Sequence, residues 1–170
     1  MECGMGSLRM GVNIKVLLFT LIFGLFICFS AWGSMVSFYI VEAGLDENNE
    51  NARQGIVWEN AFLDVFFEAG HIVSNAPILR MRTIPQGDLL RTVAYDVLDD
   101  RGGGIEFVII ALLDYGNNAM TPRNVVFYVY NAMTREKVLE REIQGRAYRN
   151  SREEFDDIKS MARGLVPYVN

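Results

Sequence analysis

IEFVIIALL, residues 105–113, is the stretch that decides the fold predicted by this sequence. Almost all of its residues are apolar, at odd and even positions alike, so a strand built from them would be buried on both faces. Such a strand belongs in the middle of a sheet that has other layers on each side. Residues 105–113 therefore predict an α/β protein.

Segments on both sides of this strand predict the remaining elements. Residues 125–130 and 138–143 predict two strands joined by a hairpin, and the second, more charged one is expected at the edge of the sheet. The other expected elements are a strand over 35–41, a helix over 50–70, a short strand over 71–74, a helix over 87–101 and a final helix starting with a capping box of Ser151 and Glu154. Residues 78–85 are ambiguous and resemble a loop.

This order of elements predicts an α/β fold, with α+β as the alternative. We expect a single mixed sheet of about five strands with about three helices packed on it. The helix over 50–70 has an apolar stripe of Ile56, Leu63 and Phe67, which Trp58, Phe62, Val65, Phe66 and Ala69 widen. Its dense aromatic face is expected to lie in the core, and any part left exposed would mark a partner interface.

An apolar N-terminal segment precedes this fold. Arg9 and Lys15 stand before an almost purely apolar run over 16–29, and Ala31 and Gly33 fit an A-x-A-like cleavage site. Residues 1–33 are thus predicted to be a signal peptide or membrane anchor, and 34–170 a single periplasm-facing α/β domain.

Three interpretations of this segment stay open. It is a cleaved signal peptide, or an uncleaved anchor, because the uncharged stretch over 16–41 exceeds the roughly 20 residues that span a bilayer. The third is a lipoprotein lipidated at Cys28, although the large, branched Ile27 fits such a site poorly. Export to the periplasm, or anchoring at a membrane facing it, is the expected localisation.

Charge and cysteine usage exclude several classes of function. Lys and Arg number 16 against 21 Asp and Glu, a formal net charge of -5, which disfavours nucleic-acid binding. The cluster of Arg146, Arg149 and Arg152 is followed at once by acidic residues and indicates a solvated face of mixed charge. Cys3 and Cys28 are the only cysteines, so residues 34–170 contain no disulfide and no thiolate site.

The elements resemble, in order and texture, those of a known domain group. The likeness lies in the order of the elements. A strand at 38–41 is followed by a helix, Gly70 and a short strand, then by a second helix with glycines and the strand at 106–110, and last by a turn at 134–136 between two strands. The group comprises the TolB N-terminal region, the curli-secretion pore lipoprotein and the lipoprotein activators of penicillin-binding proteins. The likeness covers roughly residues 35 to 168.

This resemblance implies an envelope domain that acts in binding or assembly and carries no catalytic residues. Two departures stand out. Asn131 and Arg135-Glu136 occupy places where the group usually has Asp and Thr-Gly. Most members are also lipidated at a cysteine, which Cys28 fits poorly.

Acidic residues are the main candidates for chemistry. Asp96 and Asp100 lie four residues apart on one helix face, with Asp99 between them, and Asp114 follows the buried strand. Paired carboxylates can bind a hard cation or perform acid–base catalysis, and strand ends in α/β sheets often contact ligands. A solvated helix face and a capped turn at Asp114 are the simpler interpretations.

Two further residues have a structural and a functional interpretation. His71 is the only histidine, so neither a zinc site nor a triad has the partners it needs, and a structural role is favoured. Trp58 is expected in the core, with contact to a partner as the alternative.

Taken together, the sequence predicts a non-enzymatic envelope protein that serves assembly or protein–protein contact, with no cofactor and no metal. Its partners would be unidentified envelope proteins, and a homo-oligomer is a further possibility. The competing hypothesis is a small-ligand or divalent-cation binder, or an enzyme, that uses Asp96, Asp99, Asp100 and Asp114.

Overall fold

The computed structural model describes residues 33–44, 54–85, 90, 92–93, 95–96, 104–116 and 121–170. Its strands are β1 (Met35–Ala43), β2 (Ile72–Asn75), β3 (Leu79–Met81), β4 (Phe107–Asp114), β5 (Asn124–Asn131) and β6 (Lys137–Gln144). The helices with defined bounds are α2 (Gln54–Glu68) and α4 (Ser151–Arg163), and the short 3-10 helix η1 (Val166–Tyr168) follows. The predicted signal or anchor segment lies outside the described residues, apart from Gly33.

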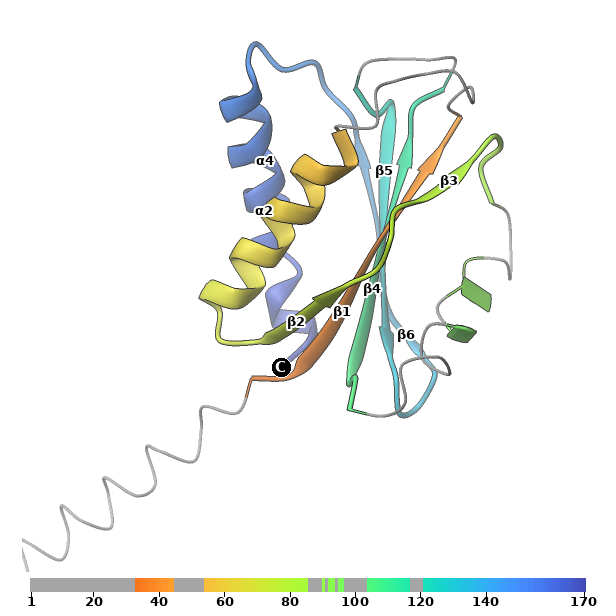
Figure 1. The fold of residues 1–170 in the computed structure, drawn as a ribbon, viewed down its shortest axis with the longest axis vertical. Coiled ribbons are helices and arrows are strands. Elements are labelled where there is room, and N and C mark those ends of the chain that lie inside the picture. Colours follow the sequence, from red (N-terminus) through yellow and green to blue (C-terminus); the bar gives the residue numbers. More distant parts are fainter. Residues whose placement is uncertain are drawn as a thin grey trace, which may run out of the picture. The chain divides into compact units, whose positions relative to one another are not determined.

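All six strands belong to one mixed sheet in which β2, β1, β4, β5 and β6 follow one another (Figure 1). β1 pairs in parallel with β2 and β3 on one side and with β4 on the other. β4, β5 and β6 are antiparallel neighbours, and β6 forms the charged edge that its composition predicts. The α/β class with a single mixed sheet is therefore confirmed.

The number of elements differs from the prediction. The sheet has six strands rather than about five, because residues 79–81, expected in a loop, pair with 41–43 of β1. Two α-helices have defined bounds, against about three expected. Of the predicted helix over 87–101, Leu90, Thr92, Val93, Tyr95 and Asp96 are described, and these are helical. No helix within the described ranges is long and apolar enough to cross a membrane.

The central strands β1 and β4 are buried on both faces, as residues 105–113 predicted for β4. α2 and α4 cover one face, where Phe38 of β1, Ile109 of β4 and Phe127 of β5 belong to the larger apolar cluster (Figure 1). The opposite face carries a second cluster that includes Tyr39, Val108 and Leu90. Alternation of side chains along β1 and β4 supplies both clusters from the same strands.

The cap of α4 lies one residue earlier than predicted. Asn150, not Ser151, is the N-cap, and its Oδ1 accepts the N–H of Glu153 at 2.9 Å. Glu153 Oε2 in turn accepts the N–H of Arg149 at 3.1 Å. Because Asn150 and Ser151 are both followed three residues later by Glu, the pattern fits either register, and the amide forms the cap here.

Candidate functional site

The carboxyl ends of the two central strands gather polar side chains. β1 and β4 are parallel and finish side by side, where Ala43 pairs with Asp114, and β5 begins next to them at Asn124. The first turn of α2 lies against the same end of the sheet, because the N–H of Gly55 reaches Glu42 of β1 (Figure 1). In open α/β sheets, ligands usually bind just beyond the carboxyl ends of the strands, at the point where the order of the strands along the sheet reverses.

Asp114 borders a polar groove at this end of the sheet. The groove has a volume of about 640 Å³ and is lined by Asp114, Arg123, Asn124, Glu142 and Gln144. Asp114 Oδ1 accepts the N–H of Gly116 at 2.9 Å, and Asn124 Nδ2 donates to Glu142 Oε1 at 2.6 Å. Asp114 thus caps the turn after β4 and at the same time faces a polar hollow.

The other predicted acidic residues are only partly described. Asp96 is exposed and helical, whereas Asp99 and Asp100 lie outside the described residues. Among the residues that the structure describes, no three His, Cys, Asp or Glu side chains are arranged to hold a metal ion.

Glu42 is a buried carboxylate that the sequence analysis missed. Its side chain is 0% exposed, near the end of an otherwise apolar strand. Oε1 accepts the N–H of Gly55 at 3.1 Å, and Oε2 accepts from Nε of Arg80 at 3.0 Å. A buried charge needs such partners, because desolvation would otherwise make it unstable. The one available signal was a single acid within the apolar run of residues 35–43.

Unlike Glu42, three buried polar groups near the helix-covered face have no hydrogen-bond partner among the described residues: Tyr115 Oη, Glu154 Oε1 and Trp58 Nε1. Burial raises the pKa of Tyr115 far above its usual value, and the charges of Glu42 and Glu154 add to this. Burial also raises the pKa of Glu154, in the first turn of α4. Desolvation, rather than pairing with a specific cation, is therefore the main cause of the raised pKa values of Tyr115 and Glu154.

Trp58 and His71 are both interior residues. The Trp58 side chain is 0% exposed and lies against Phe127, with ring centroids 6.3 Å apart. His71 is also buried, its ring centroid lies 5.7 Å from that of Phe66, and neither of its ring nitrogens has a hydrogen-bond partner within the part of the chain that the structure describes. Both therefore contribute to packing in this structure, and Trp58 presents no surface to a partner.

The aromatic helix α2 has two apolar faces instead of one wide face. Trp58, Phe62 and Phe66 pack onto the sheet, but Ile56 is 48% exposed and Phe67 78% exposed. The expectation that all the aromatic residues lie in the core is wrong for Phe67. We call the outward stripe of Ile56, Asn60, Leu63 and Phe67 the α2 ridge; exposed apolar surface of this kind marks contact sites.

A hollow lies along the α2 ridge. Its volume is about 510 Å³, and its lining combines both helices and β2: Asn60, Leu63, Asp64, Phe67, Val73 and Phe155. Beside it, Lys159 of α4 donates to the carboxylates of Asp64 and Glu68 of α2. These ion pairs raise the pKa of Lys159, with the hydrogen bond to Asp64 as the largest cause.

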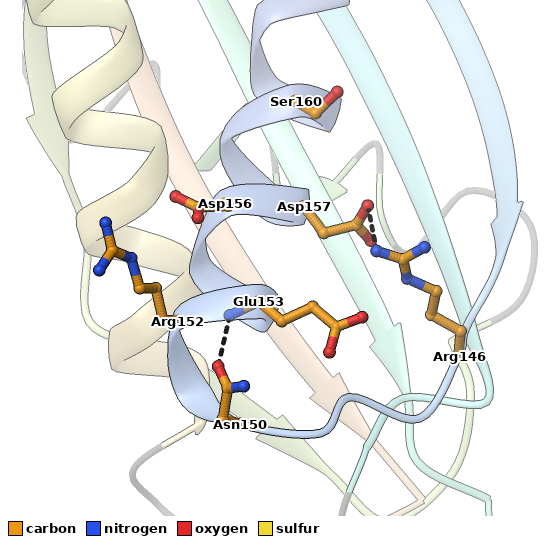
Figure 2. A pocket seen from close by; sticks show the side chains of 7 residues that line it. All are labelled: Arg146, Asn150, Arg152, Glu153, Asp156, Asp157 and Ser160. Atoms are coloured by element: carbon orange, nitrogen blue, oxygen red, sulfur yellow. Dashed lines mark hydrogen bonds and ion pairs between the residues drawn. The ribbon is translucent and has the colours of Figure 1, made fainter.

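A third hollow, of about 510 Å³, lies at the start of α4 and has mixed charge, as the sequence predicted (Figure 2). Figure 2 shows Arg146 reaching from the segment before α4 to Asp157, with Nη2 and Oδ1 2.9 Å apart. Tyr148 Oη donates to the other oxygen of Asp157 at 3.0 Å. Burial, with this hydrogen bond, raises the pKa of Tyr148 to about 12. Arg146 and Asp157 thus neutralise each other, and the rest of the lining mixes the basic Arg152 with the acidic Glu153 and Asp156.

Comparison with known proteins gives a remote likeness in fold. No family model and no curated protein matches the sequence. The chain is similar to a PelC dodecamer from Paraburkholderia phytofirmans, with 12% identity and a TM-score of 0.45 over 81% of this chain and 88% of that chain. It is also similar to TolB from Acinetobacter baumannii, with 12% identity and a TM-score of 0.40 over 81% of this chain and 29% of that chain.

With identities of 12% and TM-scores below 0.5, these likenesses assign the chain to no family. TolB is also one of the proteins that the resemblance stated from the sequence names. Neither structure identifies a site residue, so the candidate sites stand on the geometry of this chain alone. Two of them are used below: the α2 ridge, which is an exposed surface, and the polar groove beside Asp114.

Proposed function

We propose that this chain is a non-enzymatic cell-envelope protein whose folded domain makes protein–protein contacts in an assembly. The observation that carries the proposal is the α2 ridge, where Phe67 is 78% exposed beside a hollow of about 510 Å³. Holding a large aromatic side chain in water forfeits the stability that its burial would supply. A partner that covers the ridge would recover it.

The envelope location rests on the N-terminal sequence. Arg9 and Lys15 followed by the apolar run over 16–29 are typical of export or membrane anchoring. Mass-spectrometric mapping of the N-terminus from cells tests this part directly. A cut before Ser34, or an intact chain in the membrane fraction, is expected, whereas intact Met1 in a soluble cytoplasmic fraction would contradict the proposal.

The non-enzymatic part rests on how the described polar groups are used. Glu42 is held by Gly55 and Arg80, Asp114 caps a turn, and His71 is enclosed in the core. A general acid or base must instead reach a substrate. Glu42 and His71 serve the fold alone, whereas Asp114 also borders the polar groove, and the use of the first two supports a role in contact rather than in chemistry.

Photo-crosslinking in cells tests the contact function. Phe67→p-benzoylphenylalanine in the full chain places the crosslinker on the α2 ridge, and the same substitution at Met133, which is 85% exposed in the β5–β6 hairpin, is the control. We expect the crosslinker at position 67 to form adducts with one particular envelope protein or with another copy of this chain. The crosslinker at position 133 should form few adducts. Equal labelling at both positions, or none at position 67, would overturn the proposal.

The groove beside Asp114 favours a second candidate function, the binding of a small polar ligand or a divalent cation. Asp114, Glu142 and Arg123 offer oxygen and guanidinium groups around about 640 Å³. Thermal melting of the full chain with and without Mg²⁺ or Ca²⁺ discriminates the two functions, because a ligand of the folded state raises the melting temperature. The contact function predicts no shift, and a shift lost in Asp114→Asn would favour the ligand function.

A further inference from the structure

We propose that residues 1–33 stay attached to the folded domain as a membrane anchor, and that the bond between Gly33 and Ser34 is not cut. This inference rests on the envelope location proposed above and decides between a cleaved and a retained segment. It depends on the contacts of Gly33 and Ser34, on the start of β1 and on the length of apolar sequence that remains before it.

Both residues that flank the predicted cut belong to the packed domain. Ser34 is only 8% exposed, and its carbonyl accepts the N–H of Ile72 at 3.1 Å, at the end of the sheet where β1 and β2 begin side by side (Figure 1). Gly33 belongs to the same compact unit as residues 34–170. Proteolytic cleavage concentrates at exposed, irregular segments, and this hydrogen-bonded start of the sheet is not one of them.

The fold gives its own reason for a glycine at position 33. A Cβ atom there would collide with the carbonyl oxygen of Gly70 and would lie 2.9 Å from Cα of His71. Both are backbone atoms, which cannot swing aside as the end of a flexible side chain can. Packing therefore explains the small residue at position 33, and this residue does not by itself indicate a cleavage site.

A cut before Ser34 would leave the domain with an unfavourable end. It would remove Gly33 from its close approach to Gly70 and would place a charged ammonium group on a residue that is only 8% exposed. A charge in such surroundings is costly unless it is paired. The intact chain instead passes through this point with a neutral peptide bond.

The start of β1 fixes how much apolar sequence is left for an anchor. The uncharged stretch runs over 16–41, but Met35–Ala43 form a buried strand of the sheet. Residues 16–32 remain, about 17 residues, which just reaches the roughly 17–25 that a spanning helix needs. Lys15 before this stretch and Trp32 at its end are typical of the two borders of a membrane span.

Mapping the N-terminus in cells tests the retained anchor. The full chain with a C-terminal tag is recovered from the membrane fraction, and its intact mass and N-terminal peptide are measured. We expect a chain that begins at Met1 and stays in the membrane after extraction with sodium carbonate. A chain that begins at Ser34, or at a lipidated Cys28, would overturn the inference.

Replacement of Gly33 tests the same inference through stability. Gly33→Ala keeps an A-x-A-like site, but its Cβ collides with the Gly70 carbonyl if residue 33 remains in the protein. We expect the melting temperature of the detergent-solubilised full chain to fall by about 3–10 °C. Ser30→Ala, in the segment before the domain, is the control and should leave the melting temperature unchanged. No fall for Gly33→Ala would mean that residue 33 is absent from the folded protein or makes no close contact in it, and either would overturn the inference.

The outcomes separate this inference from the proposed function. A soluble periplasmic chain that begins at Ser34 would overturn the retained anchor, but the envelope location would stand. Intact Met1 in a soluble cytoplasmic fraction would contradict both. The contact function has its own test in the crosslinker at position 67, whose result does not depend on where the chain begins.

Discussion

Glu42 Oε1 accepts the backbone N–H of Gly55 at 3.1 Å, which ties the end of β1 to the first turn of α2. This carboxylate takes the place that a capping side chain or an anionic ligand often occupies at a helix N-terminus. Its other oxygen is paired with Arg80 just after the start of β3. One buried side chain thus joins a strand, a helix and the short strand that sequence reasoning missed.

Breaking this arrangement is expected to destabilise the fold. Glu42→Ala should lower the free energy of unfolding by about 3 kcal/mol, because it leaves a cavity and an unpaired N–H at Gly55. Arg80→Ala should cost less, about 1–2 kcal/mol, since half of the arginine side chain is exposed. Urea unfolding measures both, with Lys137→Ala, which removes a surface ion pair, as the control. Equal losses for Glu42→Ala and the control would contradict the role of Glu42.

Gly55 is expected to resist replacement by alanine. A Cβ atom there would lie 2.7 Å from Glu42 Oε1 and 2.7 Å from Ile78 Cδ1, so one of them must move. Alanine normally stabilises a helix by about 1 kcal/mol relative to glycine, yet Gly55→Ala should destabilise this protein. Asn60→Ala, on the exposed side of the same helix, is the matched control and should not destabilise. Stabilisation by Gly55→Ala in thermal melts would count against the close approach.

Two adjacent phenylalanines should differ sharply in their effect on stability. Phe66 is 1% exposed and Phe67 78% exposed. Phe66→Ala should cost about 3–5 kcal/mol through lost burial and a cavity, whereas Phe67→Ala should change stability by less than about 0.5 kcal/mol. Chemical unfolding of both variants compares them directly. Similar losses would mean that the α2 ridge is covered within the protein itself.

Glu154 should make stability fall as the pH rises. Its pKa is raised by burial in the folded state, so the folded protein binds this proton more tightly than the unfolded chain. Its contribution is therefore neutral below the unfolded pKa, becomes increasingly unfavourable as the pH rises from the unfolded pKa to the raised folded pKa, and is fully unfavourable above that. Glu154→Gln, which has nearly the same shape without the charge, should gain stability relative to the wild type at pH 7 and lose that advantage at pH 4. A difference that does not depend on pH would refute this account.

His71 is expected to tolerate an apolar substitute. Its ring is buried, and neither nitrogen has a hydrogen-bond partner in the described ranges. His71→Leu removes two unsatisfied polar atoms at similar volume, so stability should be unchanged or rise by up to about 1 kcal/mol. Calorimetric melting temperatures test this, with Ile158→Ala in the larger apolar cluster as a destabilising reference. A large loss in His71→Leu would show that the imidazole is needed.

Particular elements show which parts of the fold could be predicted from the sequence. Unbroken apolarity over 105–113 correctly predicted a central strand, and the charges of 138–143 correctly predicted an edge strand. The strand over residues 79–81 was not predicted, because three residues carry no periodic signal and their partners in β1 lie far away in the sequence. At α4 two overlapping capping patterns were present, and the choice of Asn150 depended on the geometry of the folded chain.

The sequence by itself determined the class of fold, the burial of the central strand on both faces and the acidic, cysteine-free character of residues 34–170, because these follow from composition and from patterns along single elements. Only the tertiary structure decided which of the two apolar stripes of α2 faces the sheet. It also decided that Glu42 is buried and that Asp114 lines a groove. The physical reason is that burial and pairing depend on residues distant in the chain, such as Arg80 and Glu42, which only the packed sheet brings together.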